Sequence, residues 1–451
     1  MEETEMTSSL TTAYGRINAL LDAGSFVEIG AHVAARYSAA GEINGDGVVT
    51  GYGTIDGALV YVYAQDPSYL GGSIGEMHAK KISKLYDLAM QMKAPLIAIV
   101  DCAGVRLNEG NDSLFSFGCM FSHQAKASGI IPQITAVFGT CGGGMAVAAA
   151  MSDFVFMEND GKLFLNSPNA VKGNFEGKCD TAAAAFQSEK TGVADFTGTA
   201  DEIYAAIREL VTMIPQSNAL DLSYTECGDD LNRAVAGIDA LKCKVEMIQQ
   251  IADNGKYVEV KAANAPCITT GFIKLNGSTI GVVANNSPEK AICFGGCKKA
   301  IHFINFCDAF SIPVLTLVDV DGFKRNEMNE KLLARGIAKL TYTFANATVP
   351  KVTVIVGDAY GTAGVCMNSK AIGADIVYAW TGSKMGLMDK TLLEGITDAV
   401  DKDINAAEYN ARRGYVDDII APAETRQRVA AAFEMLYNKE VEILPKKHGT
   451  V

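Results

Sequence analysis

The chain has 451 residues, 49% of them hydrophobic, which is enough for two or three domains with packed cores. A formal net charge of −13 and a pI near 5.0 argue against a nucleic-acid groove, because such a groove needs a basic stripe; a local basic patch for a phosphorylated ligand remains compatible. No apolar run approaches the roughly 20 residues of a membrane helix, so we expect a protein that does not itself span a membrane.

The 11 cysteines lack the paired spacing of a structural zinc site. Cys293 and Cys297 are close in the sequence, but no second pair follows at a matching separation, so we expect no metal. Each cysteine taken alone is more simply explained as a small buried apolar residue. Scattered thiols without a signal peptide predict reduced cysteines and a cytoplasmic location.

The first expected elements are a short amphipathic helix within residues 7–24 and two strands joined by a tight turn at 55–57. Residues 76–93 carry apolar positions at helical spacing, and 96–100 form a continuous apolar run typical of a strand buried on both faces. The next expected elements are helix 113–128, strand 133–138, a glycine-rich turn, an alanine-rich helix and strand 154–157. This alternation predicts an α/β fold built from right-handed crossovers.

The same pattern recurs in the second half of the chain at one spacing. The pairs that lie 218 positions apart are Pro95 and Pro313, Asp101 and Asp319, Gly104 and Gly322, Pro132 and Pro350, and Gly139 and Gly357. A constant offset over five landmarks predicts two domains of one fold, which we place at 1–255 and 256–451. Residues 215–255 are polar and helix-like with no visible counterpart in the first copy, so we expect them to be the connector.

The strongest local signal is the run 139–146, with three consecutive glycines between a buried strand and a helix. Glycines let the backbone approach a ligand closely, and N–H groups at a helix start can converge on an oxygen that gains negative charge. An isolated glycine triplet is more often a packing turn. The second copy, however, places the small-residue run 358–364 at the same location, which favours a functional turn in both copies.

Two further segments are candidates for binding. The glycine-rich run 70–76 begins a helix that carries Lys80 and Lys81; it could hold a phosphate, or it could be an ordinary N-cap at Ser73 beside surface lysines. The loop 101–110 follows a buried strand, and ligands of α/β folds bind at the carboxyl ends of strands.

Several catalytic signatures are missing. The sequence has no nucleophile elbow, no phosphate-binding P-loop, no dinucleotide fingerprint and no convincing biotin attachment site. An enzyme with this sequence would therefore act through backbone hydrogen bonds and positioning.

The chain resembles the carboxyltransferase (beta) subunit of biotin-dependent acyl-CoA carboxylases of the propionyl-CoA carboxylase type. It also resembles the carboxyltransferase subunit of sodium-pumping methylmalonyl-CoA decarboxylases. The segments that carry the resemblance are 46–53, 71–81, 139–146, 307–310, 318–323, 369–370, 413–417 and 445–449. They occur in the family's order and extend from about residue 12 to the carboxyl terminus.

The resemblance implies two tandem crotonase-like domains of the ββα superhelix type, with acyl-CoA on the first and biotin on the second. In the first, Gly143 and Gly144 are expected to stabilise the enolate oxygen of the thioester; in the second, Gly361, Thr362 and Ala363 are expected to polarise the biotin ureido oxygen. The residues expected around acyl-CoA are Gly71, Gly72, Ser73, Gly104, Val105, Arg106, Cys141 and Gly142. Those expected on the biotin side are Phe323, Tyr360, Gly364 and Val365.

The resemblance also implies partners. Biotin would be attached to a separate biotin carboxyl carrier protein, with either a biotin carboxylase subunit or a membrane decarboxylase subunit as the further partner. The active site would lie between subunits of a dimer, within a hexamer of three dimers.

The chain departs from the family pattern at the second turn, where Thr362, Gly364 and Val365 replace glycine, tyrosine and aspartate. The run 382–389 also differs, the N-terminus is trimmed, and residues are deleted after about 395. We therefore weigh three functions: carboxylation of a small acyl-CoA, its reverse in a decarboxylating sodium pump, and a non-catalytic structural subunit. A crotonase-type hydratase is disfavoured. It needs a pair of acidic residues beside the first turn, and the sequence has no convincing pair there, since Glu109 and Asp112 lie in a different loop.

Overall fold

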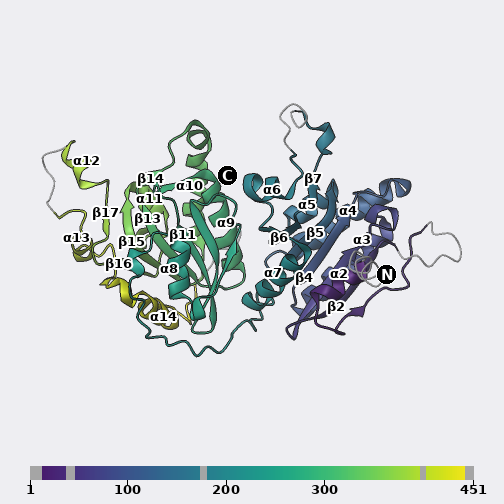
Figure 1. Cartoon of the computed structure of the whole chain (residues 1–451), viewed down its shortest axis with the longest axis horizontal. Helices are drawn as coiled ribbons and strands as arrows, with labels where there is room; N and C mark the ends of the chain where they lie inside the picture. The colour runs from purple at the N-terminus through teal and green to yellow at the C-terminus, as the bar shows by residue number, and fades with distance from the viewer. Residues whose placement is uncertain (1–12, 37–45, 173–179, 397–402, 442–451) are drawn as a thin grey trace. The chain divides into compact units, whose positions relative to one another are not determined.

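The computed structural model describes residues 13–36, 46–172, 180–396 and 403–441. The chain divides into two compact units, Met1–Ser223 and Tyr224–Val451, and most of their helices and many of their strands are labelled in Figure 1. Residues 224–255, which the sequence-based division assigned to the first domain, group with the second unit. The tail segment 445–449 lies outside the described residues.

The first unit is built on an eight-stranded sheet in the order β1-β2-β3-β4-β5-β6-β8, with β7 paired to β5. Its strands are β1 (Val27–Glu28), β2 (Val48–Ile55), β3 (Ala58–Gln65), β4 (Leu96–Cys102), β5 (Gln133–Gly142), β6 (Phe154–Glu158), β7 (Lys162–Phe164) and β8 (Phe196–Gly198). Its helices are α2 (Ala13–Leu20), α3 (Glu76–Met92), α4 (Asn111–Ala127), α5 (Gly144–Ala150), α6 (Ala184–Phe186) and α7 (Ala200–Met213). The pairs β1–β2 and β2–β3 are antiparallel, and all other pairs are parallel.

The second unit has an eight-stranded sheet in the order β18-β16-β15-β13-β11-β10-β9, with β17 paired to β15. Its strands are β9 (Tyr257–Val260), β10 (Ile268–Leu275), β11 (Ser278–Asn285), β13 (Val314–Val320), β15 (Lys351–Tyr360), β16 (Ile376–Trp380), β17 (Lys384–Gly386) and β18 (Asp418–Ile420); β12 (Ala291–Ile292) and β14 (Gly322–Phe323) form a separate pair. Its helices are α8 (Lys244–Ile251), α9 (Phe294–Ala309), α10 (Glu327–Asn346), α11 (Gly361–Cys366), α12 (Lys390–Glu394), α13 (Ala407–Arg412) and α14 (Thr425–Met435).

The two sheets repeat one another strand for strand, from the antiparallel hairpin β2–β3 or β10–β11 through the parallel strands that follow. Even an irregularity recurs at the same place. The register shifts between Val100 and Cys102 in the first sheet and between Val318 and Val320 in the second. The prediction of a duplicated α/β fold is therefore confirmed.

The repeat extends further than the constant offset revealed. Helix α8 sends Lys244 to Asp319 at 3.0 Å, just as α2 sends Arg16 to Asp101 at 3.0 Å. The interpretation of 215–255 as a connector without a counterpart was therefore wrong for α8. The match escaped detection because Arg16 and Lys244 are separated by more than the offset that the strands share.

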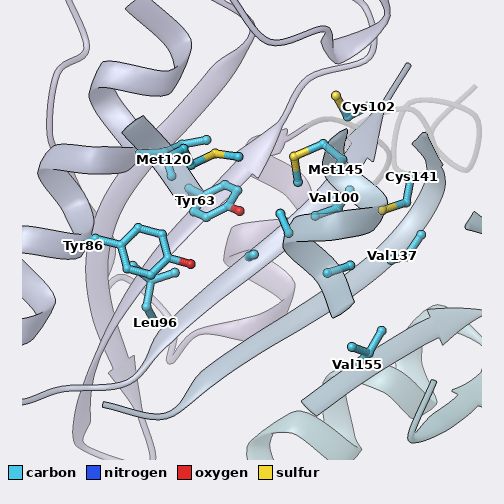
Figure 2. Packing of buried hydrophobic residues seen from close by; sticks show 14 of the residues in the cluster. Tyr63, Tyr86, Leu96, Val100, Cys102, Met120, Val137, Cys141, Met145 and Val155 are labelled. Atoms are coloured by element: carbon cyan, nitrogen blue, oxygen red, sulfur yellow. The ribbon is translucent and has the colours of Figure 1, made fainter. Parts of the chain in front are cut away.

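The main core of the first unit lies between its sheet and helices α3 and α4. Figure 2 shows Tyr63, Leu96 and Met120 in this cluster, in which all three are buried. Ile97 and Ile99 are equally buried, and by the alternation of a strand they face the opposite side of the sheet. The prediction that β4 is buried on both faces is confirmed. Among the described residues, no helix combines the length and apolarity needed to cross a bilayer.

Candidate active site

The first glycine turn joins the end of β5 to the start of α5. Gly143 has φ +58° and ψ −122°, a conformation that side chains disfavour. Its N–H donates to the carbonyl of Phe164 on β7 at 3.0 Å, so this donor is already engaged. The N–H of Gly144 belongs to the first turn of α5, whose donors have no acceptor within the helix. Gly143 thus shapes the turn, while Gly144 offers the free donor.

Close packing explains why Gly144 is glycine. A Cβ atom there would lie 2.7 Å from the ring of Phe117, far inside normal contact distance. Cys141, two residues before the turn, is fully buried, so only its backbone could take part in binding. Burial also raises the pKa of the Cys141 thiol, which removes it as a nucleophile at neutral pH.

The loop after β4 runs directly beside this turn. Cys102 pairs with Cys141 across the sheet, and a Cβ atom on Gly104 would be 3.6 Å from the carbonyl of Gly142. Val105 forms a β-bridge with Ile74. The structure therefore gathers at one place the backbone segments that contain Gly71, Gly72, Ser73, Gly104, Val105, Cys141 and Gly142.

Arg106 has a different environment from the other residues of its loop. Its side chain is only 2% exposed and forms an ion pair with Glu109 at 2.9 Å. It also donates to the carbonyls of Ser73 at 2.7 Å and Asp46 at 2.8 Å. These bonds commit the guanidinium to holding the loop together, so Arg106 positions the candidate binding segment instead of facing a ligand.

The start of α3 does not follow the expected capping. Its N-cap is Gly75, without a side-chain cap, and the N–H of Glu76 donates to the carboxylate of Glu109 at 2.6 Å. The alternative of an N-cap at Ser73 is not observed, because the Glu109 carboxylate, distant in sequence, takes that place; the alternative of a phosphate at this helix start stays a prediction. Lys80 is exposed as expected, but Lys81 is buried and donates to the carbonyl of Val48 at 2.5 Å.

The second turn joins β15 to α11 in the other unit. Gly361 has φ +58°, the same value as Gly143. A Cβ atom on Gly364 would lie 2.8 Å from the carbonyl carbon of Ala359, so glycine is required there too. Thr362 is exposed, Val365 is 43% exposed and Ala363 is buried. The N–H groups of Gly361, Thr362 and Ala363 therefore lie in the first turn of α11, beside exposed side chains.

A cavity of about 730 Å³ opens beside the second turn. It lies between β15, β17, α11 and α13, and its wall includes Gly361, Thr362, Val365, Leu387 and Tyr415. Tyr360 and Phe323, the other residues expected on the biotin side, do not belong to this wall. Tyr360 is 5% exposed, and Phe323 lies on β14. The N–H groups of the first turn of α11 and the adjacent open space suit a ligand group that accepts hydrogen bonds.

Each turn rests on a partly buried aspartate that sequence reasoning did not select as a site residue. Asp101 accepts from the N–H of Thr140 at 3.1 Å, and Asp319 accepts from the N–H of Asp358 at 3.0 Å. A Cβ atom on Gly139 would fall 2.2 Å from the Asp101 carboxylate, which explains one conserved-looking landmark of the repeat as a packing requirement. The signal was present in the sequence as the recurring aspartate and glycine at a fixed offset.

The second aspartate belongs to a larger charge network. Lys290 contacts Asp319 at 3.0 Å and also forms a short ion pair with Asp358, just before the turn. Burial alone would raise the pKa of Asp319, but the N–H of Asp358 and the ammonium groups of Lys244 and Lys290 lower it. Burial likewise opposes the charge of Lys290, yet its hydrogen bonds to Asp358 and Asp319 raise its pKa. Within the described residues, no cluster of three or more His, Cys, Asp or Glu side chains is arranged to hold a metal.

Three comparisons relate this chain to known proteins. Residues 6–408 match the model of a family described as the carboxyl transferase domain. The propionyl-CoA carboxylase beta chain of Roseobacter denitrificans is 39% identical, over 98% of this chain and 93% of its own. The methylmalonyl-CoA decarboxylase subunit alpha of Veillonella parvula is also 39% identical, over 98% of this chain and 92% of the Veillonella subunit. A structure of transcarboxylase 12S, described as a hexamer with methylmalonyl-coenzyme A and methylmalonic acid bound, matches with a TM-score of 0.91 at 32% identity, over 99% of this chain and 93% of that one.

Proposed function

The chain belongs to the carboxyl transferase family and is an acyl-CoA carboxyltransferase, and we propose that it moves a carboxyl group between biotin on a separate carrier protein and a small acyl-CoA. Propionyl-CoA and acetyl-CoA are the proposed substrates. The observation that carries the proposal is the pair of equivalent turns, each with a glycine at φ +58° where a strand meets a helix start. One turn would serve each of the two reactants.

In the first unit, the N–H of Gly144 would donate to the thioester oxygen of acyl-CoA as that oxygen becomes an enolate. Gly71, Gly72 and Gly104 let these backbone segments pack closely beside the first turn, since a Cβ atom on Gly72 would fall 2.1 Å from the carbonyl oxygen of Asp101. A preorganised donor of this kind typically contributes about 3 kcal/mol to transition-state stabilisation. Arg106 and Glu109 would hold the binding loop in place through their buried ion pair.

In the second unit, the N–H groups of Gly361, Thr362 and Ala363 would hold the ureido oxygen of biotin. When bound, biotin supplies the carboxyl group and a nitrogen that can exchange a proton with the substrate. No side chain of this chain is needed as the base, which agrees with the buried, unreactive character of Cys141 beside the first turn. The chain's own residues would therefore bind, orient and polarise the reactants.

The first test is decarboxylation of malonyl-CoA and methylmalonyl-CoA by the purified protein, with and without free biotin. We expect biotin-dependent formation of acetyl-CoA or propionyl-CoA, because both turns must be occupied for transfer. The preferred thioester would then identify the acyl group. Absence of turnover with both thioesters, in protein that assembles normally, would refute this function and favour a structural subunit.

The 39% identity with a methylmalonyl-CoA decarboxylase subunit supports a second candidate, the same reaction run as decarboxylation for a membrane sodium pump. One active site serves both directions by microscopic reversibility. Proteins that co-purify from the source organism would distinguish the two: a biotin carboxylase supports carboxylation, and an integral membrane subunit supports decarboxylation. In both cases we propose a cytoplasmic homo-hexamer whose active sites are shared between subunits, and a monomer by light scattering would contradict this assembly.

A further inference from the structure

Two cysteines of the second unit meet at the start of a long helix. Cys293 is the N-cap of the 16-residue helix α9, and its sulfur accepts a hydrogen bond from the N–H of Gly296 at 3.3 Å. Cys267, from the loop before β10, lies against the same glycine: a Cβ atom on Gly296 would fall 2.7 Å from its sulfur. Both cysteines are free and partly exposed. The fold thus brings together two thiols from distant positions in the sequence.

The environment favours a thiolate on one of the two. The neighbouring Cys267 thiol lowers the pKa of Cys293, and the N–H groups of Gly296 and Gly295 act in the same direction. The same interaction, with burial, raises the pKa of Cys267. A helix N-terminus stabilises negative charge near it. Cys293 is therefore the nucleophile of the pair, and Cys267 is the thiol that can resolve a bond formed on it.

The first unit supports this assignment of charge. The residue equivalent to Cys293 is Gly75, the N-cap of α3, where the carboxylate of Glu109 accepts from the helix N–H. In the first unit, a carboxylate therefore accepts the hydrogen bond at the helix start. In the second unit, the sulfur of Cys293 is the acceptor at the equivalent helix start. The residue equivalent to Cys267 is Val49, so the pair exists in one copy only.

We propose that Cys293 and Cys267 form a reversible oxidation site, whose substrate is a small-molecule disulfide such as oxidised glutathione. The Cys293 thiolate attacks one sulfur of that disulfide, and the displaced thiolate leaves. The thiol of Cys267 then passes its proton to the second leaving sulfur as it attacks Cys293. Two protein thiols are oxidised to one disulfide, and one glutathione disulfide is reduced to two glutathiones.

The position of the pair gives this oxidation a route to the second turn. Cys293 directly follows β12, which pairs with β14, and the N–H of Lys324 donates to the carbonyl of Ile292 at 2.9 Å. A disulfide would remove the sulfur's negative charge and pull Cys293 toward the 267 loop. Oxidation should therefore loosen the β12–β14 pair, and β14 contacts α11, the helix that begins at the second turn.

The test is incubation of the intact protein with oxidised glutathione, followed by peptide mapping and hydrogen exchange. We expect a Cys267–Cys293 disulfide in the wild type, its reversal by dithiothreitol, and a glutathione adduct trapped on Cys293 in Cys267→Ser. Exchange at 322–324 should rise on oxidation in the wild type and stay unchanged in Cys293→Ser. Cys243 is the matched control, because it too is a partly exposed N-cap cysteine but makes no side-chain cap hydrogen bond.

Two results would overturn the proposal. One is glutathione adducts that form on Cys243 as readily as on Cys293, without a Cys267–Cys293 disulfide. The other is a disulfide that forms but leaves exchange at 322–324 unchanged, which would remove the link to the second turn. Neither readout needs carboxyl transfer, so the test stands apart from the proposed function.

Discussion

Gly72 of the first unit and Lys290 of the second occupy equivalent places, since they share the repeat offset and both have positive φ, +64° and +49°. A Cβ atom on Gly72 would lie 2.1 Å from the carbonyl oxygen of Asp101. Lys290 carries a full side chain at its position and bridges Asp319 and Asp358. The duplicated backbone has thus been kept while its side chains have diverged. One unit packs bare backbone tightly beside its turn, and the other has a charged network.

The largest expected effect comes from breaking the feature that both units share. Gly143→Ala and Gly361→Ala should each lower kcat by about 10²–10³, because a side chain disfavours this backbone conformation and relaxation of the turn would misplace the neighbouring donors. The measurement is biotin-dependent decarboxylation of malonyl-CoA. Gly57→Ala is the matched control, since Gly57 also has positive φ and open space around it but lies in the β2–β3 hairpin. If Gly361→Ala kept full activity, only the first turn would be catalytic.

A second substitution separates the donor from the shape of the turn. Thr362→Pro removes one N–H from the first turn of α11, where proline is tolerated, and should lower kcat about 10²-fold. Thr362→Ala keeps the N–H and should change kcat by less than about threefold, because the Thr362 side chain is exposed. Equal losses in the two variants would assign the role to the threonine side chain instead of its backbone.

The sequence predicted the fold and the location of both turns, because glycine patterns and buried strands are local signals. It did not predict Arg16 or Lys244 as supports, since each reaches its aspartate from a helix distant in the sequence. It left two alternatives open at the start of α3 and did not predict that Glu109 accepts from the helix N–H there. These contacts depend on tertiary packing, which brings together side chains that no local spacing relates. The roles of the individual site residues remain predictions for the experiments above.

Breaking the charge network of the second unit should have a smaller effect, in kcal/mol, than breaking the turns, and the effect should be on the stability of the unit. Lys290→Met would leave Asp358 without its partner and should lower the free energy of unfolding by about 1–2 kcal/mol, a value reduced by partial exposure of both side chains. Asp358→Asn should have a similar cost, and the double variant should cost less than the sum of the two. Trp380 is the single tryptophan of the chain and is buried in the second unit, so its fluorescence during urea denaturation reports on this unit alone. Strict additivity would show that the pair is not coupled.

The smallest expected effect is a pH dependence of stability that is confined to the first unit. His78 is buried on α3 and lies near Gln65 and the carbonyl of Asp46; the equivalent residue in the second unit is Gly296. Burial, together with the nearby positive charge of Arg106, lowers the pKa of His78 to about 3. Between this value and the ordinary pKa of about 6.5, only the unfolded state binds the proton.

The His78 contribution to stability is therefore complete above pH 6.5 and is lost as the pH falls toward 3. At pH 5.5 the first unit should be about 1 kcal/mol less stable than at neutral pH from this group alone. Hydrogen exchange in α3, corrected for the intrinsic pH dependence of exchange, measures the effect, and α9 in the same molecule is the internal reference. His78→Gln should remove the pH response of α3 while leaving α9 unchanged. A response of equal size in both helices would mean that acid acts on groups common to the two units, and the divergence of their helix starts would then have no thermodynamic consequence.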